Sequence, residues 1–560
     1  MDNMIFNPLE DYEKTYKERH NGHVDALFNE LEKKSQINVA ENRATVAKYK
    51  AQQEKAAGIK KKAGVLKGLR IAAFVLMILA VLIAVLLFVL AAILPGIGLL
   101  VFSGALLAIV LAVLNPKIKN LNQLFEQENA AAQQLFQLCW QQMEPLNNLF
   151  QSWDGISLIE KTIPNFDFQP LFSVKQEKDM VDHYNFQPYA DEDRSVIDTL
   201  SGTYNDNPFL YERCLVHEMG TETYHGQKTI YWTETYRDSN GRRQTRRRSQ
   251  TLHATVTKPK PFYRTETKLY YGAQAGPDLS FNRDNKHLEN KSERSIDAMV
   301  RKGERKLQKK AEKAMENNQN FMGMTNTEFD ILFDALDRDH EVQFRLLFTP
   351  LAQTNMVSLL RSITGYGDDF DFYKKRRMNT IVSEHSQQRD LLLQPKAIRS
   401  YDYDEVKTKF RDCHNEYFRS IYFDFAPLLA LPVYQERPVH SLHPIPDNYQ
   451  RYPVQEYEVL LNAMDSRQLA HPNSRTKAIL KAAHASSHGS TDTVRVTAHS
   501  YDAIARVDVV PVHGSDGRIH GVPVHWQEYL PLEAHNEVYI GTDSKNANVH
   551  KHGIYARISK

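Results

Sequence analysis

Seven histidines lie close together in the C-terminal third of the chain, a pattern that raises the question of metal binding. They are His484, His488, His499, His513, His520, His525 and His535. On a helix, four-residue spacing would place the rings of His484 and His488 on one face. Zinc-dependent hydrolases with this spacing carry a glutamate directly after the first histidine, and here Ala485 takes that position. We therefore interpret these residues as surface histidines and predict neither a metal site nor a cofactor.

A cluster of five arginines follows a predicted hairpin turn. Its members are Arg242, Arg243, Arg246, Arg247 and Arg248. Guanidinium groups bind phosphates and lipid headgroups through paired hydrogen bonds. A charged hairpin tip also keeps a sheet edge soluble, and no aromatic residues alternate with the arginines as single-strand nucleic-acid binding would favour. We favour the charged tip, and contact with an anion or a protein partner stays open as the alternative.

No catalytic signature accompanies these clusters. The chain contains no GxxxxGKS/T loop, no GxGxxG after a predicted strand and no GxSxG elbow. Cys413 and His414 are sequence neighbours, whereas a catalytic Cys–His pair normally comes from separate elements. Asp368, Asp369 and Asp371 lie beside glycines, and we expect them in an exposed loop. The sequence identifies no catalytic residue, and it leaves enzymatic activity uncertain.

Composition limits the class of protein. The 560 residues allow several domains, and mean hydropathy is −0.51 despite a long apolar run, so the remaining chain must be water-soluble. A formal net charge of +2 argues against a nucleic-acid-binding role for the whole chain, and we expect no nucleic-acid partner. The three cysteines are far apart, which fits a reducing compartment and provides no disulfide framework.

One apolar stretch organises the rest of the chain. No charged residue occurs from Ile71 to Leu114. A membrane-spanning helix needs about 20 apolar residues, so this stretch is too long for one crossing and long enough for two. Pro95-Gly96-Ile97-Gly98 lies near its middle, and these residue types break helices and form turns. We predict a transmembrane helical hairpin over residues 71–114, with Ile71–Leu94 and Ile97–Leu114 as its helices. A buried hairpin of a soluble protein is the alternative.

Basic residues flank this stretch on both sides. They are Lys60, Lys61, Lys62, Lys67 and Arg70 before it, and Lys117 and Lys119 after it. Because basic flanks stay on the cytoplasmic side, we expect both termini in the cytoplasm and only the turn on the far side. No secretory signal precedes the stretch in the sequence. The predicted location is the cell inner membrane, with two crossings and the lipid bilayer as a partner.

Long helices are expected on both sides of the apolar stretch. Helix formers dominate residues 8–68, which we assign to an N-terminal cytoplasmic helix. A mostly apolar seam with three- and four-residue spacing follows the stretch: Ile118, Leu121, Phe125, Glu128, Ala132, Leu135, Cys139, Gln142 and Leu146. We predict that residues 117–150 form a helix that pairs with the N-terminal helix as an antiparallel coiled coil. Packing of both helices onto the next domain is the alternative.

Residues 160–400 are predicted to form a β-rich soluble domain. Period-two alternation and β-branched or aromatic residues mark the strands Phe209–Glu218, Lys228–Tyr236, Arg246–Thr257, Phe262–Tyr271 and Met378–Val382. Asp238-Ser239-Asn240-Gly241 supplies a hairpin turn, so we expect an antiparallel sheet of at least four strands. Residues 282–320 are polar and basic, which favours a solvated helix or a connector.

Residues 401–560 are predicted to form a C-terminal α+β region. Helices are expected over Val406–Phe423 and Val454–Ala463. The expected strands are Val494–Ala498, Ile504–Val512, Gly517–Trp526 and Glu537–Ile540, with a turn at Gly514-Ser515-Asp516-Gly517. The predicted fold class is therefore an α+β membrane protein with a helical hairpin anchor, and its soluble part comprises one domain or two.

The order of several short motifs resembles a known family. Asn207-Pro208-Phe209 through Glu212 resembles an NPFxLxE-like strand, Phe329-Asp330 through Asp339 an aspartate-rich segment, and Leu346 through Pro350 a Leu-Leu-Thr-Pro-like segment. Over about residues 60–385, this order is similar to uncharacterised bacterial membrane proteins that carry a domain of unknown function. The chain differs in its long Thr- and Arg-rich hairpin, its basic helix and its C-terminal third. The resemblance implies a bacterial origin and a membrane location, and it supplies no catalytic residues.

These observations favour a non-catalytic membrane scaffold or receptor whose cytoplasmic β-rich domain binds a protein or an envelope component. A protein partner or a second copy of the chain is expected. A membrane-tethered enzyme with a site in the C-terminal region is the alternative. Attraction of arginines to an anionic leaflet fades over about 8–10 Å, so a tip at the end of a long stalk would lie out of range. We therefore expect the five arginines to face solvent or a protein.

Overall fold

The computed structural model describes residues 4–90, 93–188, 191–237, 241–316, 323–335, 337–438, 452–541, 549–551 and 554–558. The chain divides into two compact units. The helical unit comprises His20–Gly155 and Leu392–Tyr417, and the β-rich unit comprises Met1–Arg19, Ile156–Leu391 and Phe418–Lys560. This division differs from the predicted boundary at residue 400, because the C-terminal strands belong to the same unit as the first sheet.

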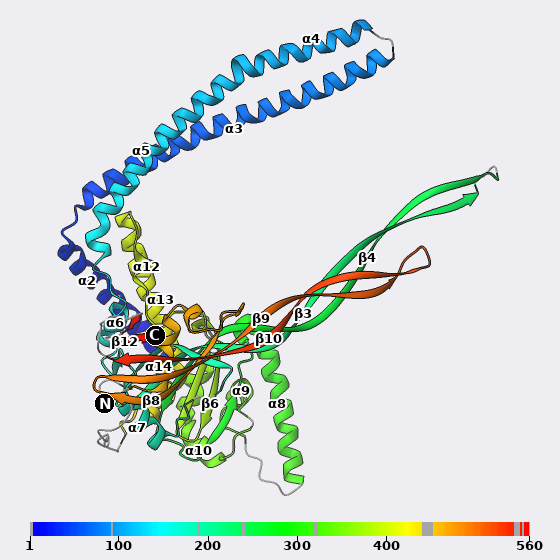
Figure 1. Cartoon of the computed structure of the whole chain (residues 1–560). Helices are drawn as coiled ribbons and strands as arrows, with labels where there is room; N and C mark the ends of the chain where they lie inside the picture. Colours follow the sequence, from blue (N-terminus) through cyan, green and yellow to red (C-terminus); the bar gives the residue numbers. More distant parts are fainter. Residues whose placement is uncertain are drawn as a thin grey trace. The chain divides into compact units, whose positions relative to one another are not determined.

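The helical unit is built around two long antiparallel helical segments (Figure 1). The first is α3 (Val39–Val89), and the chain returns through α4 (Ile93–Ile109), the π-helical turn η2 (Val110–Leu114) and α5 (Asn115–Asn147). Both segments are long and apolar enough to cross a membrane. Only 17% and 6% of their most apolar stretches is buried, so most of these apolar side chains are exposed.

Contacts between α3 and α5 follow an antiparallel register. They join Tyr49 to Phe136 at 5.3 Å between ring centroids, Lys60 to the Phe125 ring at 5.7 Å, and Arg70 to Asn115 at 3.3 Å. Every predicted seam position from Ile118 to Leu146 is buried or half-buried. Helices α3 and α5 therefore pack against each other along these positions.

The turn of the apolar hairpin lies earlier than predicted. Helix α3 ends at Val89, and α4 already begins at Ile93, so Pro95–Gly98 lies inside the first turns of α4. The predicted turn at these residues is wrong, because the first turn of a helix accepts proline without losing an intrahelical hydrogen bond. A Cβ atom on Gly96 would lie 3.1 Å from the Phe88 ring, so glycine here permits close approach of the two helices.

The predicted N-terminal helix over residues 8–68 is interrupted. Helices α1 (Pro8–Asp11), η1 (Tyr12–Tyr16) and α2 (Lys17–Ser35) precede α3 in the chain. Gln36 adopts a φ of 54°, and the Asn38 side chain then accepts a hydrogen bond from the Glu41 backbone at 3.1 Å. This N-cap begins a new helix, which explains the break within a sequence of good helix formers.

The β-rich unit contains a seven-stranded sheet with the order β1-β2-β3-β4-β7-β6-β5, and each neighbouring pair is antiparallel. Its strands are β1 (Phe166–Gln169), β2 (Arg194–Tyr204), β3 (Asn207–Arg237), β4 (Arg243–Gly272), β5 (Ser280–Arg283), β6 (Phe370–Lys375) and β7 (Met378–Ser383). The expectation of an antiparallel sheet with at least four strands is confirmed.

A second, five-stranded sheet has the order β11-β12-β10-β9-β8. Its strands are β8 (Ile479–His488), β9 (Thr491–His513), β10 (Ile519–Gly541), β11 (Val549–Lys551) and β12 (Ile554–Ile558). The helices of the chain outside the apolar hairpin include α6 (Asp154–Thr162), α7 (Val174–Tyr184), α8 (Glu293–Glu316), α9 (Thr327–Phe333), α10 (Glu341–Leu347), α11 (Pro350–Arg361), α12 (Pro395–Ile398), α13 (Tyr403–Leu429) and α14 (Val454–Ala463). The basic segment is thus a helix, α8, and α14 has the predicted bounds.

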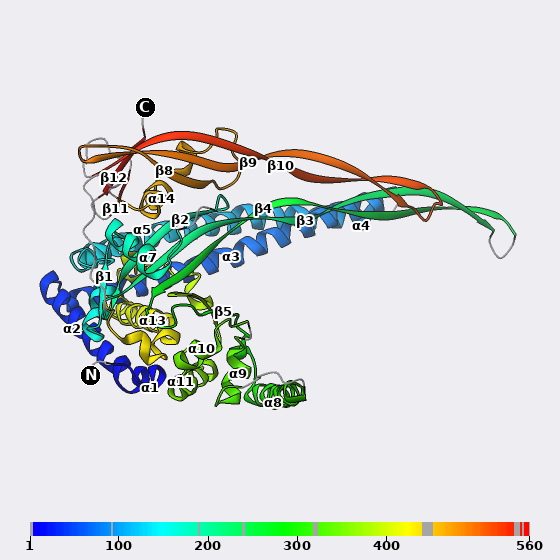
Figure 2. The same cartoon turned by 90° about the horizontal axis from the view of Figure 1, so that it is seen from below.

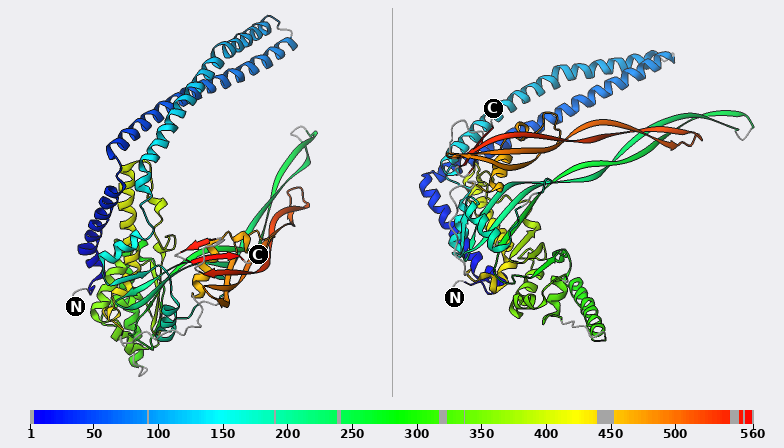
Figure 3. Two further views of the ribbon diagram at one scale, coloured as in Figure 1. Left: turned by 60° about the vertical axis from the view of Figure 1, so that its left-hand side comes forward. Right: turned by 60° about the horizontal axis from the view of Figure 1, so that its bottom comes forward.

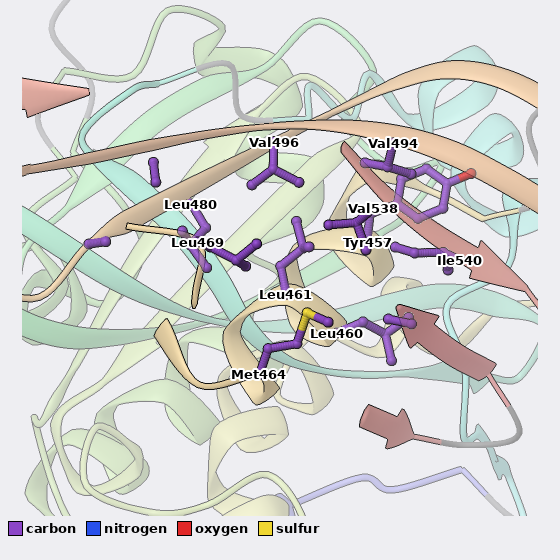
Figure 4. Packing of buried hydrophobic residues seen from close by; sticks show 13 residues of the cluster. Tyr457, Leu460, Leu461, Met464, Leu469, Leu480, Val494, Val496, Val538 and Ile540 are labelled. Carbon is purple, nitrogen blue, oxygen red and sulfur yellow. The ribbon is translucent and has the colours of Figure 1, made fainter. Parts of the chain in front are cut away.

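Helix α14 packs against both sheets. Leu460 and Leu461 lie with Val494, Val496 and Val538 in a cluster that covers the second sheet (Figure 4). On another side of the helix, Val459 packs with residues of β2 and β3, among them Cys214. Full burial of each such side chain contributes roughly 1.5–3 kcal/mol. This helix therefore joins the two sheets into one unit.

In each sheet, four of the predicted strands join in pairs and form two long strands: β3 and β4 in the first sheet, and β9 and β10 in the second. Strands β3 and β4 stay in register from Phe209–Tyr271 to Arg237–Arg243, and β9 and β10 from Thr491–Gly541 to His513–Ile519. Proline is tolerated within these strands where one edge has no neighbouring strand. The projecting parts of the two hairpins, residues 217–263 and 500–532, form what we call the arm (Figures 1 and 2).

Candidate functional site

The two hairpins of the arm pack against each other through a small apolar interface. Ile230, Leu252 and Ala254 of the first hairpin are buried with Val522 and Val524 of the second. In the two further views of Figure 3, the two hairpins again extend side by side. A Cβ atom on Gly226 would lie only 2.2 Å from the Pro523 carbonyl oxygen. Glycine therefore permits the closest approach of the two hairpins.

Polar contacts fix the same interface closer to the sheets. Lys258 forms an ion pair with Asp508 at 2.7 Å, and its ammonium lies 4.3 Å from the centre of the Trp526 ring. The Trp526 indole donates a hydrogen bond to Asp508 at 2.9 Å. Since these three side chains come from β4, β9 and β10, they tie both hairpins into one arm.

The second hairpin ends before the first. A Cβ atom on Gly514, in the turn of the second hairpin, would contact Ile230 at 2.8 Å, and Ser515 donates a backbone hydrogen bond to Gln250 at 2.8 Å. Residues 231–249, which we call the tip, come after these contacts. Trp232, the second residue of the tip, is half-buried against the apolar cluster that joins the two hairpins, whereas the other described residues of the tip are exposed.

All five predicted arginines lie on the tip and are exposed. Arg248 pairs with Glu234 at 2.9 Å, with both side chains half-exposed. Trp232 lies directly opposite Arg248, and Tyr236 lies opposite Gln244. Along the sequence, no aromatic residues alternate with the arginines, as we interpreted. In the folded hairpin this interpretation is wrong, because the aromatic residues of β3 lie opposite the arginine-rich segment of β4. The structure thus brings these arginines together with three aromatic residues of β3.

The predicted exposed loop of aspartates is wrong. Asp368 is fully buried in an ion pair with Arg283, whose guanidinium is fully buried too. Asp369 is 7% exposed, and Asp371 accepts a backbone hydrogen bond from Asn285 at 2.8 Å. A buried guanidinium requires acceptors, and Asp368 and the backbone carbonyls of Phe333 and Phe370 supply them. The position of the aspartates explains the acidic run as part of the core.

A buried histidine lies between two carboxylates in the same region. His385 contacts Asp369 at 2.5 Å through Nδ1 and Asp424 at 3.3 Å through Nε2. Tyr366 stacks on the imidazole with ring centroids 3.9 Å apart. Burial lowers the pKa of His385, but Asp424 and Asp369 raise it by more, so its pKa lies above the usual value. With both ring nitrogens engaged, this histidine crosslinks the core and has no free nitrogen for catalysis.

Two buried carboxylates lie on α14 itself. Glu456 accepts hydrogen bonds from the Phe172 backbone at 3.0 Å and from Thr199 at 2.7 Å. Glu458 accepts from the Val196 backbone at 2.8 Å and pairs with Lys481 at 2.8 Å. The β-bulge in β2 after Val196 frees this backbone group from the strand ladder.

Glu212 on β3 is the least compensated of these buried acids. Burial raises the pKa of Glu212 to about 7 against the opposing influence of a hydrogen bond from Gln455, and the nearby carboxylate of Glu458 adds a smaller increase. Burial likewise raises the pKa of Glu177 on α7 to about 7. These acids carry a proton through much of the physiological range, and sequence reasoning missed them because their neighbours come from distant elements.

The C-terminal histidines do not gather at one place. His484 and His488 lie on strand β8 and not on a helix, and a register shift follows His484. His484 is 2.8 Å from the Ser487 hydroxyl, and His520 is 2.9 Å from Asp516. In the described residues, the group with metal-compatible spacing is an exposed trio elsewhere: His287, Glu289 and Glu384.

A cavity of about 370 Å³ lies where the arm leaves the sheets. His217 contacts Asp193 at 3.1 Å on its wall, and Tyr501 stacks on the His217 ring at 5.2 Å. His499 and Glu533 also line this cavity. A histidine held by a carboxylate can accept or donate a proton, so this pair is a candidate for acid–base chemistry, and Nε2 of His217 is buried without a hydrogen-bond partner among the described residues.

Comparison of the chain with protein-family models, with curated proteins and with solved structures finds no match. The resemblance to bacterial membrane proteins therefore stays a prediction from the sequence.

Proposed function

We propose that this chain is a membrane-anchored binding protein without catalytic activity. In this proposal, α3 and α4 cross the inner membrane of a bacterial cell as a hairpin, with both termini in the cytoplasm. The paired helices α3 and α5 form a coiled-coil spacer. The β-rich unit binds a protein or an envelope component.

The exposure of the apolar hairpin carries this proposal. Leu82 is 61% exposed and Val101 is 67% exposed, and similar side chains surround both helices. Soluble proteins rarely expose an apolar surface of this extent, whereas a bilayer provides it with a matching environment. Hydrogen bonds within each helix satisfy the backbone polar groups that lipid cannot satisfy. The hairpin therefore has the properties that a lipid-embedded anchor requires.

The arm supports a binding role for the β-rich unit. Two hairpins with buried contacts between them make one extended element. Pro259 and Pro261 occur on β4 where no strand other than β3 pairs with it, and prolines at such positions prevent uncontrolled edge pairing. A partner is therefore expected to contact side chains of the arm and not its strand edges.

Membrane fractionation of the full chain tests the anchor. The full chain should stay in the membrane pellet after alkaline carbonate extraction, and a deletion of residues 71–114 should move it to the soluble fraction. Replacing Leu82 and Val101 with arginine should give partial extraction, because each arginine near the bilayer centre costs about 2.5–3.5 kcal/mol. Recovery of the full chain in the soluble fraction would contradict the proposal.

A membrane-tethered enzyme is the second candidate, and the Asp193–His217 pair in the cavity favours it. The purified full chain should be assayed with metals, nucleotides and common hydrolase substrates. The binding-protein proposal predicts no turnover. Reproducible turnover that is lost in His217→Ala and kept in the exposed control His225→Ala would establish the second candidate instead.

A further inference from the structure

The tip combines positive charge with aromatic side chains. Residues 231–249 contain six arginines and two acidic residues. Among the described residues, no carboxylate lies within ion-pair distance of Arg243, Arg246 or Arg247, whereas Arg248 is paired with Glu234. These three guanidinium groups therefore keep their hydrogen-bonding capacity for an anionic partner outside the chain.

Both faces of the hairpin contribute to this surface. Directly opposite residues share a face, so Trp232, Tyr236, Arg246 and Arg248 lie on the face that continues from buried Ile230. Arg243 and Arg247 lie on the other face with Tyr231, which is 71% exposed. Tyr236 is 49% exposed. An anionic surface could therefore be contacted by arginines and by an aromatic ring from either face.

The residue types of the tip fit the headgroup region of a bilayer. Residues 231–249 contain no Leu, Ile, Val, Met or Phe. Such a segment does not enter the hydrocarbon core, whereas Trp and Tyr are enriched at the membrane–water interface. Arginine adds attraction to phosphate groups through paired hydrogen bonds.

Length does not prevent such a contact. From His217 to Arg237, β3 extends roughly 70 Å at about 3.3 Å per residue. From Val39 to Arg70, α3 extends about 50 Å at 1.5 Å per residue. The expectation that the tip lies out of range of the membrane depends on the length of the helices alone. An arm longer than those helices removes that reason.

We infer that the tip binds anionic phospholipid headgroups at a bilayer surface. The choice of lipid over other polyanions rests on the proposed function, because a membrane anchor keeps a lipid surface close to every copy of the chain. Arg243, Arg246 and Arg247 bind the phosphate groups, and Tyr231 and Tyr236 lie in the interface beside them.

Vesicle flotation of the full chain tests this inference. The chain is first inserted into nanodiscs of phosphatidylcholine and then mixed with vesicles of phosphatidylcholine, with or without phosphatidylglycerol. Failure to enter nanodiscs would contradict the anchor, whereas insertion without flotation would contradict the tip assignment. Binding should require phosphatidylglycerol and weaken with salt, because exposed charges are screened.

Replacing Arg243, Arg246 and Arg247 with glutamine should weaken vesicle binding roughly 100-fold. The matched control replaces Arg301, Arg305 and Lys309, which are exposed on α8, with glutamine and should leave binding unchanged. Lysine at the three tip positions should keep most of the affinity, and Tyr231→Ser with Tyr236→Ser should reduce it.

Three results would overturn the lipid assignment. The first is vesicle binding that survives the glutamine changes at the tip. The second is equal loss of binding in the α8 control, which would indicate general charge attraction. The third is tip-dependent binding of a single-stranded oligonucleotide or an acidic peptide by a chain that does not bind the anionic vesicles.

Discussion

Replacing Glu212 with glutamine should stabilise the β-rich unit at pH 8 and have little effect at pH 5. Burial is the main reason that the pKa of Glu212 is raised from 4.5 to about 7. Below pH 4.5 the carboxyl is neutral in the folded and unfolded chain, so no penalty arises. Between pH 4.5 and 7 the unfolded chain ionises first, and stability falls as pH rises. Above pH 7 the loss is complete and amounts to about 3 kcal/mol.

The buried thiol of Cys214 provides the assay, because it reacts only when the β-rich unit opens. Cys214 is 4% exposed and packs with Val196, Val216 and Val459. In a background with Cys139→Ala and Cys413→Ser, the rate of labelling by a thiol reagent, divided by the rate in denaturant at the same pH, gives the free energy of opening. Glu212→Gln should slow labelling about 100-fold at pH 8.

Glu458→Gln is the contrasting variant. Burial raises the pKa of Glu458 too, but its ion pair with half-buried Lys481 opposes this effect, and the replacement removes that ion pair. Glu458→Gln should therefore slow labelling at pH 8 less than Glu212→Gln does, because it removes an ion pair together with the buried charge. The reasoning is refuted if Glu212→Gln leaves the pH dependence of labelling unchanged or accelerates labelling at pH 8.

Three further predictions address the arm, the paired helices and the buried aspartate. Gly226→Ala should separate the hairpins, destabilise their contact by about 1–3 kcal/mol and raise hydrogen exchange in residues 519–526. The exposed control His225→Ala should leave exchange there unchanged. Unchanged exchange in Gly226→Ala would contradict the packing of the two hairpins. Ala132→Asp should destabilise the α3–α5 pair by several kcal/mol, measured as exchange in residues 45–60, and the exposed control Gln133→Asp should have little effect. Asp368→Asn should destabilise the β-rich unit by about 3–5 kcal/mol, because Arg283 loses its partner. Cys214 should therefore be labelled faster than in the exposed control Asp182→Asn, and equal labelling rates in the two variants would contradict this prediction.

Local sequence patterns were sufficient for many elements. The period-two alternation located the cores of β3, β4, β9 and β10, and helical periodicity gave the bounds of α14 and the paired face of α5. The turn of the second hairpin lies at the predicted position, whereas residues 238–240 of the predicted first turn lie outside the described residues. These features depend on residues close together in sequence, which is why one sequence could reveal them.

Features that depend on distant residues were missed. Prolines such as Pro259 looked like strand ends, because the sequence does not show that this edge lacks a neighbour. The aspartates near residue 368 looked exposed, because Arg283 is distant in sequence. The turn at Pro95–Gly98 was misplaced, because Pro is equally compatible with a turn and with the first turn of a helix. In the sequence, the aromatic residues of the tip lie before the predicted hairpin turn and the arginines after it. Pairing of β3 with β4 brings them together in the structure.

Thiol labelling of whole cells tests the membrane hairpin most directly. Single cysteines replace Lys34, Leu94 or Gln151 in a full chain from which the three natural cysteines have been removed. Leu94 is 85% exposed and lies next to the turn between α3 and α4. A membrane-impermeant reagent should label Leu94→Cys in intact cells and label Lys34→Cys and Gln151→Cys only after the cells are opened. Labelling of Lys34→Cys or Gln151→Cys in intact cells, with Leu94→Cys protected, would contradict the proposed hairpin and its orientation.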